Sequence, residues 1–219
     1  MKVEEHILND IKALDIQAVV GATLSLMEEL KFCHLPVLHE GKYVGLISED
    51  ELLDVQNEED KLEKHLHVLK PYSILFTDHL FNAMRVIGEG NLSLLPVLDG
   101  NGKYCGYLSP VEITQDFGRQ LTFSEAGSLV VLNVGVRDYL LSQITQIVES
   151  DDARITGVLV NSNGVDFLRV TLKINRTDIS RILKSFERYE YEILEVYHHS
   201  IFDDTAANRY EALMKYLNI

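Results

Sequence analysis

The sequence contains two copies of one unit about sixty residues long, and this internal repeat restricts the fold more than any other feature. Leu-Pro-Val-Leu occurs at 35–38 and again at 95–98, an offset of 60. Gly-Lys-Tyr-x-Gly-x-x-Ser-x-x-Glu occurs at 41–51 and again at 102–112, an offset of 61. Ten identities with one inserted residue indicate a duplication. The first half of the chain is therefore expected to contain two copies of one structural unit.

Each copy has the hydrophobic pattern of a helix, two strands and a second helix. Apolar residues at helical spacing come first, then a short apolar run typical of a buried strand, then a glycine-containing turn and a second strand. One copy is too small to bury a core, but two packed copies suffice. In the two copies these segments are 21–30 and 80–87, 35–38 and 94–98, and 43–47 and 104–108.

These residues resemble the cystathionine-β-synthase (CBS) domain, which nearly always occurs as a tandem pair. The resemblance rests on the Leu-Pro-Val strand, the hairpin and the Gly-x-x-Ser-x-x-acid segment that opens the last helix, and it covers residues 1 to about 118. It implies a cleft between the copies that binds an adenine nucleotide or another adenosyl ligand. A serine hydroxyl and helix N-terminal amide groups suit a phosphate, and a nearby carboxylate suits ribose hydroxyls.

The sequence departs from the family at the ribose position, where both copies have Glu in place of Asp. The longer side chain can fold back to complete a capping box with the serine three residues earlier. Five positions before the proline, copy one has Lys31, whereas copy two has Asn91. We expect the first site to be the more competent one, and a purely structural role for both clefts stays open. The candidate nucleotide-binding residues are Lys31, Ser48, Glu51, Ser109 and Glu112.

The second half of the chain has a different pattern, which predicts the order βαββαβ of a ferredoxin-like domain. Two segments have helical spacing, and the other four are β-rich or alternate between apolar and polar residues. Thr177 is placed to cap the second helix, and 161–164 is expected to be a hairpin loop. In chain order the six segments are 128–136, 139–150, 155–160, 168–174, 177–186 and 191–198.

After a CBS pair, this unit resembles an ACT domain, a module used to sense amino acids or to form dimers. The family's ligand turn follows the first strand, and here Asp138 fits that turn while Tyr139 or Leu140 occupies the place of its small residue. Asp138 and Tyr139 are thus the candidate amino-acid-binding residues. Assembly through sheet edges or helix faces is the favoured role. The order CBS–CBS–ACT is similar to regulatory proteins of the acetoin-utilisation type.

We therefore predict a mixed α/β fold, with a tandem CBS pair and a C-terminal ferredoxin-like, ACT-like domain. The segment 201–219 has an apolar stripe and is expected to be a helix that packs on its own domain or crosses to a dimer partner. The predicted parts are 1–60 and 61–118 for the two repeats, 119–127 for a linker, 128–200 for the ACT-like domain and 201–219 for the final helix.

Composition limits the partners. Thirty-four acidic residues against 20 basic ones give a formal net charge of −14 and a pI of about 4.9. Such a surface repels phosphate backbones and anionic lipids, so neither nucleic acid nor a membrane is expected as a partner. We find no long apolar run or secretory leader pattern, and only two cysteines, Cys33 and Cys105. A soluble, cytoplasmic protein is expected.

The sequence offers little for catalysis. His65-x-His67 and His198-His199 are the only histidine pairs at ligand spacing, and no Cys or acidic ligands complete either one. Cys33-His34 is no dyad, because adjacent residues of a strand point to opposite sides. No catalytic motif based on a glycine-rich loop, an activated serine or a zinc-binding helix occurs. We predict no enzymatic activity, no metal and no required cofactor.

The leading hypothesis is a non-catalytic regulatory protein with AMP or another adenosyl compound as its effector, held as a homodimer by the ACT-like domain. One alternative is a protein–protein interaction scaffold with vestigial clefts and an unknown protein partner. The other is an amino-acid sensor that uses Asp138.

Overall fold

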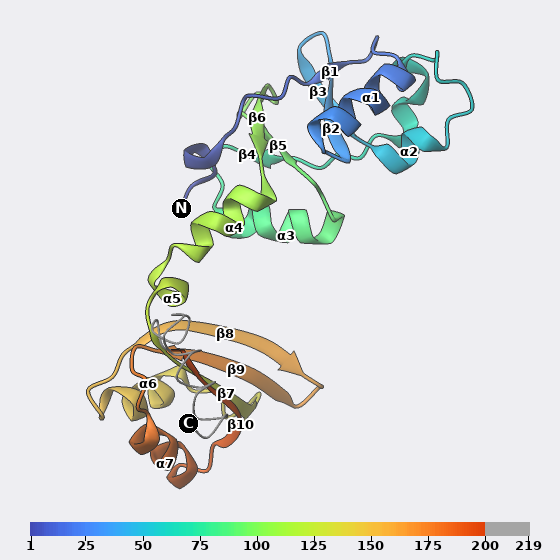
Figure 1. Ribbon diagram of the computed structural model, residues 1–219. Helices are drawn as coiled ribbons and strands as arrows, with labels where there is room; N and C mark the ends of the chain where they lie inside the picture. Colours follow the sequence, from blue (N-terminus) through green and yellow to red (C-terminus); the bar gives the residue numbers. More distant parts are fainter. Residues whose placement is uncertain (200–219) are drawn as a thin grey trace, which may run out of the picture. The chain divides into compact units, whose positions relative to one another are not determined.

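The computed structural model describes residues 1–199, and the chain divides into two compact units, Met1–Phe117 and Gly118–Ile219 (Figure 1). Over residues 1–199, no helix is long and apolar enough to cross a membrane.

The first unit contains the two copies of the repeat, and each copy forms a strand, a helix, a hairpin and a second helix. In the first copy these are β1 (Leu14–Asp15), α1 (Val20–Leu30), β2 (His34–His39), β3 (Lys42–Ser48) and α2 (Glu49–Leu53). In the second copy they are β4 (Ile74–Leu75), α3 (Leu80–Gly90), β5 (Leu95–Leu98), β6 (Tyr104–Leu108) and α4 (Pro110–Gly118). Short 3-10 helices at Val3–His6 and Leu62–Val68 complete the unit.

Each copy builds the same three-stranded sheet. The short first strand pairs in parallel with the second, and the second and third form an antiparallel hairpin, giving the orders β1-β2-β3 and β4-β5-β6. The copies meet at the start of their third strands, where Lys42 forms an antiparallel bridge with Lys103. Since these lysines are equivalent residues of the repeat, an approximate twofold axis relates the two copies.

A single hydrophobic core joins the copies. The equivalent pairs Leu35 and Leu95, and Val37 and Val97, are fully buried in one cluster that contains residues of both repeats. This cluster confirms that the two copies pack into one body, as expected from the small size of each copy.

The second unit consists of a short helix, α5 (Leu121–Ser124), and a four-stranded antiparallel sheet with α6 and α7 on one face (Figure 1). The strand order is β10-β7-β9-β8, and the chain order after α5 is βαββαβ, so the predicted mixed α/β fold class is confirmed. The elements are β7 (Gly127–Gly135), α6 (Leu141–Glu149), β8 (Ile155–Asn163), β9 (Phe167–Ile174), α7 (Ser180–Arg188) and β10 (Glu192–His199).

Two local predictions in this unit are wrong. Residues 161–163 are not part of a hairpin loop, because they pair with 167–169 and extend β8 to Asn163. Thr177 does not cap α7, since the Asp178 carboxylate accepts hydrogen bonds from the Ser180 amide and hydroxyl, and these bonds lower the pKa of Asp178. The helix predicted at 201–219 lies outside the described residues.

Candidate functional site

The first unit contains a cavity of about 220 Å³ that has walls from both copies of the repeat. We call it the Ser48 cavity, because Ser48 lies in its wall. The first copy contributes His34, Leu46, Ser48 and Asp50, and the second copy contributes Lys70, Tyr72, Gly90 and Asn91.

Backbone pairing between the copies forms the cavity wall. The segment before β4 lies along β3, where the Leu46 and Lys70 amides each donate to the other's carbonyl. Tyr72 follows in this segment, and its carbonyl accepts a 2.6 Å hydrogen bond from the Tyr43 hydroxyl. Gly90 leaves room for Leu92 and Tyr72, because a Cβ there would lie 2.8 Å from Leu92 Cδ2 and 3.0 Å from Tyr72 Cζ. The cavity therefore depends on a glycine at the end of α3.

The charges around Ser48 do not favour a phosphate. Ser48 Oγ accepts a hydrogen bond from the Glu51 amide at 3.4 Å, and α2 is only five residues long. Its first turn contains Glu49, Asp50 and Glu51, which already place negative charge at the positive end of this short helix. Lys70 Nζ lies 3.2 Å from Glu51 Oε1. The one basic residue of the cavity wall thus has an acidic partner.

His34 supplies a neutral ring to the wall. Burial lowers the pKa of His34, and the negative charge of Asp50 opposes this shift. The Ser93 amide donates to His34 Nδ1 at 3.3 Å, and the Ser93 hydroxyl lies 3.2 Å from the same atom. Because a backbone N–H can only donate, Nδ1 accepts, and the neutral ring has its proton on Nε2.

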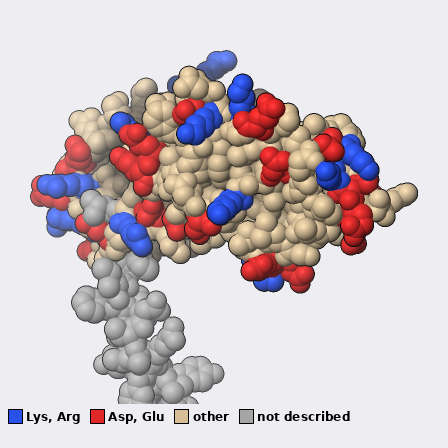
Figure 2. Space-filling view, turned by 90° about the horizontal axis from the view of Figure 1, so that it is seen from above, with Lys and Arg blue, Asp and Glu red and all other residues tan. Residues whose placement is uncertain are grey.

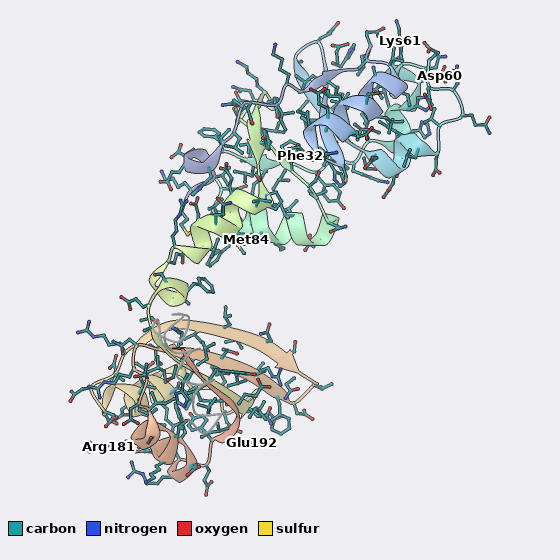
Figure 3. The ribbon with its side chains drawn as sticks, viewed as in Figure 1. Phe32, Asp60, Lys61, Met84, Arg181 and Glu192 are labelled. Atoms are coloured by element: carbon teal, nitrogen blue, oxygen red, sulfur yellow. The ribbon has the colours of Figure 1, made fainter. Side chains whose placement is uncertain are left out.

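The equivalent region of the second copy is filled by Tyr107. This residue takes the place of Leu46 in the repeat and pairs with Leu8 as Leu46 pairs with Lys70. Its side chain is 2% exposed, and its hydroxyl donates a 2.7 Å hydrogen bond to Asp10 Oδ1. Phe32, which lies between the two sheets (Figure 3), contacts the Tyr107 ring edge-on at 5.8 Å. Burial, followed by Asp10, raises the pKa of Tyr107.

Of the predicted nucleotide-binding residues, the structure places Ser48 in the cavity wall and Glu51 beside it. Ser48 lines the cavity, whereas Glu51 is paired with Lys70, and Lys31 is an exposed residue with a φ of 60° at the end of α1. Asn91, the equivalent of Lys31, lines the Ser48 cavity instead. The second copy contributes residues to the cavity of the first. By the approximate twofold symmetry, the cleft to which Lys31 belongs is therefore that of Ser109 and Glu112 in the second copy.

Of the eight wall residues, only Ser48 was among the predicted site residues. The seven others include the polar or ionisable side chains of His34, Asp50, Lys70 and Tyr72. Asp50 and His34 lie within or beside the repeated motif, but a single copy gives no reason to select them. Lys70 and Tyr72 lie in the second copy before its first strand, outside the repeated motif, and only the pairing of that segment with β3 brings them to Ser48. The duplication is the signal that could have predicted them, because two copies packed about a twofold axis bring residues of one copy to the site of the other.

The second unit separates Asp138 from Tyr139. Asp138 lines a cavity of about 470 Å³ between the β7–α6 and α7–β10 connections, and its amide donates to the Gly135 carbonyl. Tyr139 packs against the hydrophobic core. The described wall also contains Glu190 and Glu192 and no lysine or arginine. An amino acid placed there would find no cationic partner for its carboxylate.

The histidines form no described metal site. Within residues 1–199, no group of three or more Cys, His, Asp or Glu side chains is placed to hold a metal ion. His65 Nε2 lies 3.5 Å from Asp60 Oδ2, and Asp60 also accepts a hydrogen bond from Lys64. On the face shown in Figure 2, lysine and arginine residues are spread out among acidic ones.

A family model described as "CBS domain" matches residues 3–58, which correspond to the first copy of the repeat. Three solved structures illustrate the similarity. A CBS domain pair/ACT domain protein from Thermotoga maritima is 19% identical, with 53% of this chain and 96% of that chain covered and a TM-score of 0.48. The CBS domains of a transcriptional regulator from Streptococcus pneumoniae are 15% identical, with coverages of 52% and 98% and a TM-score of 0.47.

The third structure, CBSX2 in complex with AMP, is 24% identical, with 54% of this chain and 98% of that chain covered and a TM-score of 0.44. None of these structural similarities is close enough to transfer a ligand to this chain.

Proposed function

We propose that the protein is a non-catalytic regulatory sensor that binds an adenosyl ligand in the Ser48 cavity. The observation that carries the proposal is the composition of the cavity wall, to which both copies of the repeat contribute. A ligand in contact with both copies changes the free energy of their arrangement, which is what a sensor requires. Soluble, cytoplasmic residence is part of the proposal.

The wall offers a partner for each part of a nucleoside. Ser48 and Asp50 supply a hydroxyl and a carboxylate for ribose hydroxyls, and Asn91 and the Nε2–H of neutral His34 supply hydrogen-bonding groups for a base. The Tyr72 ring provides an apolar surface. About 220 Å³ is below the roughly 300–1,000 Å³ of most small-molecule sites, so the cavity suits one nucleoside rather than a dinucleotide.

Calorimetry with adenosine, AMP, ATP and S-adenosylmethionine tests this proposal. Ser48→Ala is expected to weaken binding by about tenfold, since a hydrogen bond to the ligand is lost. Ser109→Ala is the matched control, because Ser109 holds the equivalent position in the second copy and is expected to leave binding unchanged. If all four compounds fail to bind at millimolar concentration, the scaffold alternative replaces the sensor.

The second unit supplies the proposed dimer contact through the outer edge of β8. Natural proteins protect exposed strand edges with charge, proline or bulges. β10, the other edge, contains Glu192 and Glu195 and has a bulge between Ile193 and Glu195. β8 also has an irregularity, between Ile155 and Gly157, but it contains no charged residue and no proline over nine residues. In a chain of net charge −14, such an edge lets a second copy pair about a twofold axis without charge repulsion.

Sedimentation velocity tests this contact. Val160→Glu places two carboxylates near the twofold axis of the paired β8 strands, and it is expected to turn a dimer into a monomer. Val165→Glu is the control, because Val165 is 93% exposed in the turn beyond β8. A monomeric wild-type protein, or a Val160→Glu variant that remains a dimer, would rule out the β8 edge.

The amino-acid sensor is the less favoured function, because the wall around Asp138 is acidic. A thermal-shift screen of the amino acids tests it. An amino acid that raises the melting temperature of the wild-type protein but not of the Asp138→Asn variant would support this function.

A further inference from the structure

The sheet of the second unit has a second cavity, on the face opposite α6 and α7. Core residues such as Val130 and Leu172 point toward these helices, whereas their strand neighbours Leu129 and Thr171 line the cavity. Its volume is about 510 Å³, within the range of small-molecule sites. The described residues of its wall are Thr122, Phe123, Leu129, Gly157, Leu159, Thr171, Lys173, Tyr197 and His198. We call it the Lys173 cavity.

One side of this cavity is built by α5, which docks against β8. The Thr122 hydroxyl donates a 2.6 Å hydrogen bond to the Thr156 carbonyl. Gly157 makes this close approach feasible, because a Cβ there would lie 2.3 Å from Thr122 Cγ2. Phe123, on the same short helix, joins Leu129 and Leu159 in the wall. The result is a largely apolar chamber whose floor is the sheet.

Lys173 is the exceptional residue of this chamber. It lies on β9 between Leu129 and Gly157 of the neighbouring strands, and it is only 6% exposed. Buried lysines are almost always paired, because desolvation of an ammonium group is costly. Yet the ammonium group of Lys173 forms no ion pair or hydrogen bond with another side chain in the described part of the chain.

The carboxylates on β10, the edge strand beyond β7, have other partners. Arg169 Nη2 lies 3.3 Å from Glu195 Oε1, and the Tyr197 hydroxyl donates to the other Glu195 oxygen. Glu192 accepts a 2.6 Å hydrogen bond from the Asn133 side chain. Lys173 is thus a residue only 6% exposed that lines an apolar cavity without a described carboxylate partner, and the charge complement of its ammonium group is an anion.

We propose that the Lys173 cavity binds a small carboxylic acid with an apolar body, with the carboxylate on the Lys173 ammonium group. The apolar body lies along Phe123, Leu129 and Leu159, and the Thr171 hydroxyl is available to donate to the second carboxylate oxygen. None of the wall residues within 1–199 has a carboxylate. A simple acid is therefore preferred over an amino acid, whose ammonium group would be buried beside that of Lys173.

Binding of octanoate to the full-length protein, measured by calorimetry, tests this assignment. Octylamine and 2-aminooctanoate are the matched probes, since both keep the chain length and change the head group. We expect octanoate to bind at least about tenfold more tightly than either, because only octanoate forms a charge-assisted hydrogen bond without a second buried ammonium group. Equal binding of octanoate and octylamine, or no binding of octanoate at millimolar concentration, overturns the proposal.

Lys173→Met keeps an apolar side chain of similar length and removes the charge. It is expected to weaken octanoate binding by about tenfold or more. Lys184→Met is the matched control, because Lys184 is exposed on α7 at the other face of the sheet. Unchanged octanoate affinity in Lys173→Met overturns the role of the lysine.

Thermal unfolding without ligand gives a second, independent readout. If the ammonium group awaits an external anion, Lys173→Met raises the melting temperature, because an apolar side chain replaces a largely buried lysine that has no described carboxylate partner. A lower melting temperature would show that Lys173 already has a carboxylate partner from another part of the protein or from a second copy, and this result overturns the proposal. None of these measurements depends on the Ser48 cavity.

Discussion

Removal of the Tyr107 hydroxyl tests whether the hydrogen bond between Tyr107 and Asp10 stabilises the second copy of the repeat. The perturbation is Tyr107→Phe, which keeps the buried ring and its edge-on contact with Phe32 and deletes only the 2.7 Å hydrogen bond to Asp10. A hydrogen bond to a charged group contributes about 1.5–3 kcal/mol. Asp10 is exposed and regains water when the bond is lost, so we expect the low end of that range, about 1.5 kcal/mol.

Tyr104→Phe is the matched control. The Tyr104 hydroxyl is buried without a hydrogen-bond partner among the described residues, and burial raises the pKa of Tyr104 to about 12. Its deletion removes an unsatisfied polar group, so the free energy of unfolding is expected to stay constant or to rise by up to about 1 kcal/mol. Of two tyrosines three positions apart on β6, only Tyr107 is thus expected to lose stability when its hydroxyl is removed.

Urea unfolding of the first unit is the assay. At a slope of about 2 kcal/mol per molar, a loss of about 1.5 kcal/mol moves the Tyr107→Phe midpoint down by roughly 0.7 M without a change of slope. Equal midpoints for the two variants would refute the reasoning, because the bond to Asp10 would then contribute nothing to stability.

Three further predictions concern the Ser48 cavity. Leu46→Tyr installs the residue that fills the second copy, and it is expected to lower affinity for the adenosyl ligand by about tenfold or more with the fold retained; calorimetry and circular dichroism check both parts. Gly90→Ala places a Cβ 3.0 Å from Tyr72 Cζ, so we expect weaker ligand binding in calorimetry, and unchanged affinity would contradict this role of Gly90. Because burial lowers the pKa of His34, the unfolded state takes up a proton first as the pH falls below about 6.5, and stability is lost there. His34→Leu is expected to reduce this loss between pH 7.5 and 5.5 in urea unfolding, and equal losses would exclude His34 as its source.

The repeat made most of the fold of the first unit predictable. Ten identities in register implied equivalent elements, and the apolar run at 35–38 marked a buried strand, whose Leu35 and Val37 are in the core. In the second unit, the spacing of apolar residues gave the element order but not every boundary. Asn161 and Asn163 have a composition typical of a turn, yet pairing with β9 keeps both in a strand. The hydrogen bonds between β8 and β9 thus outweigh the turn propensity of these residues.

The site was less predictable because its walls come from residues far apart in the sequence. Ser48 was evident from its capping position, but its neighbours in the cavity include Lys70 and Asn91 of the other copy. Sequence reasoning assigned Lys31 to Ser48 because both belong to copy one. In the twofold arrangement, the residue beside Ser48 is instead Asn91, the equivalent of Lys31 in the other copy. The sequence of a single repeat does not show which residues of the other copy it contacts. Lys173 had no sequence signal at all, since an alternating strand does not show which polar residue is buried.

The electrostatics of the first unit bear on which adenosyl compound the Ser48 cavity selects. Residues 1–120 contain 20 acidic and 10 basic residues, a net charge of −10. In the cavity wall, Asp50 is the one described carboxylate, and the only lysine, Lys70, is held by Glu51. A phosphate would have to displace Glu51 from Lys70 and approach Asp50, whereas an uncharged ribose hydroxyl gains Asp50 as an acceptor without that exchange. Adenosine or a cationic adenosyl compound is therefore expected to bind more tightly than AMP, and AMP more tightly than ATP. Glu51→Gln releases Lys70 from its ion pair, so it should raise the affinity for AMP relative to adenosine, and calorimetry of both ligands with this variant would show whether the ion pair sets the preference.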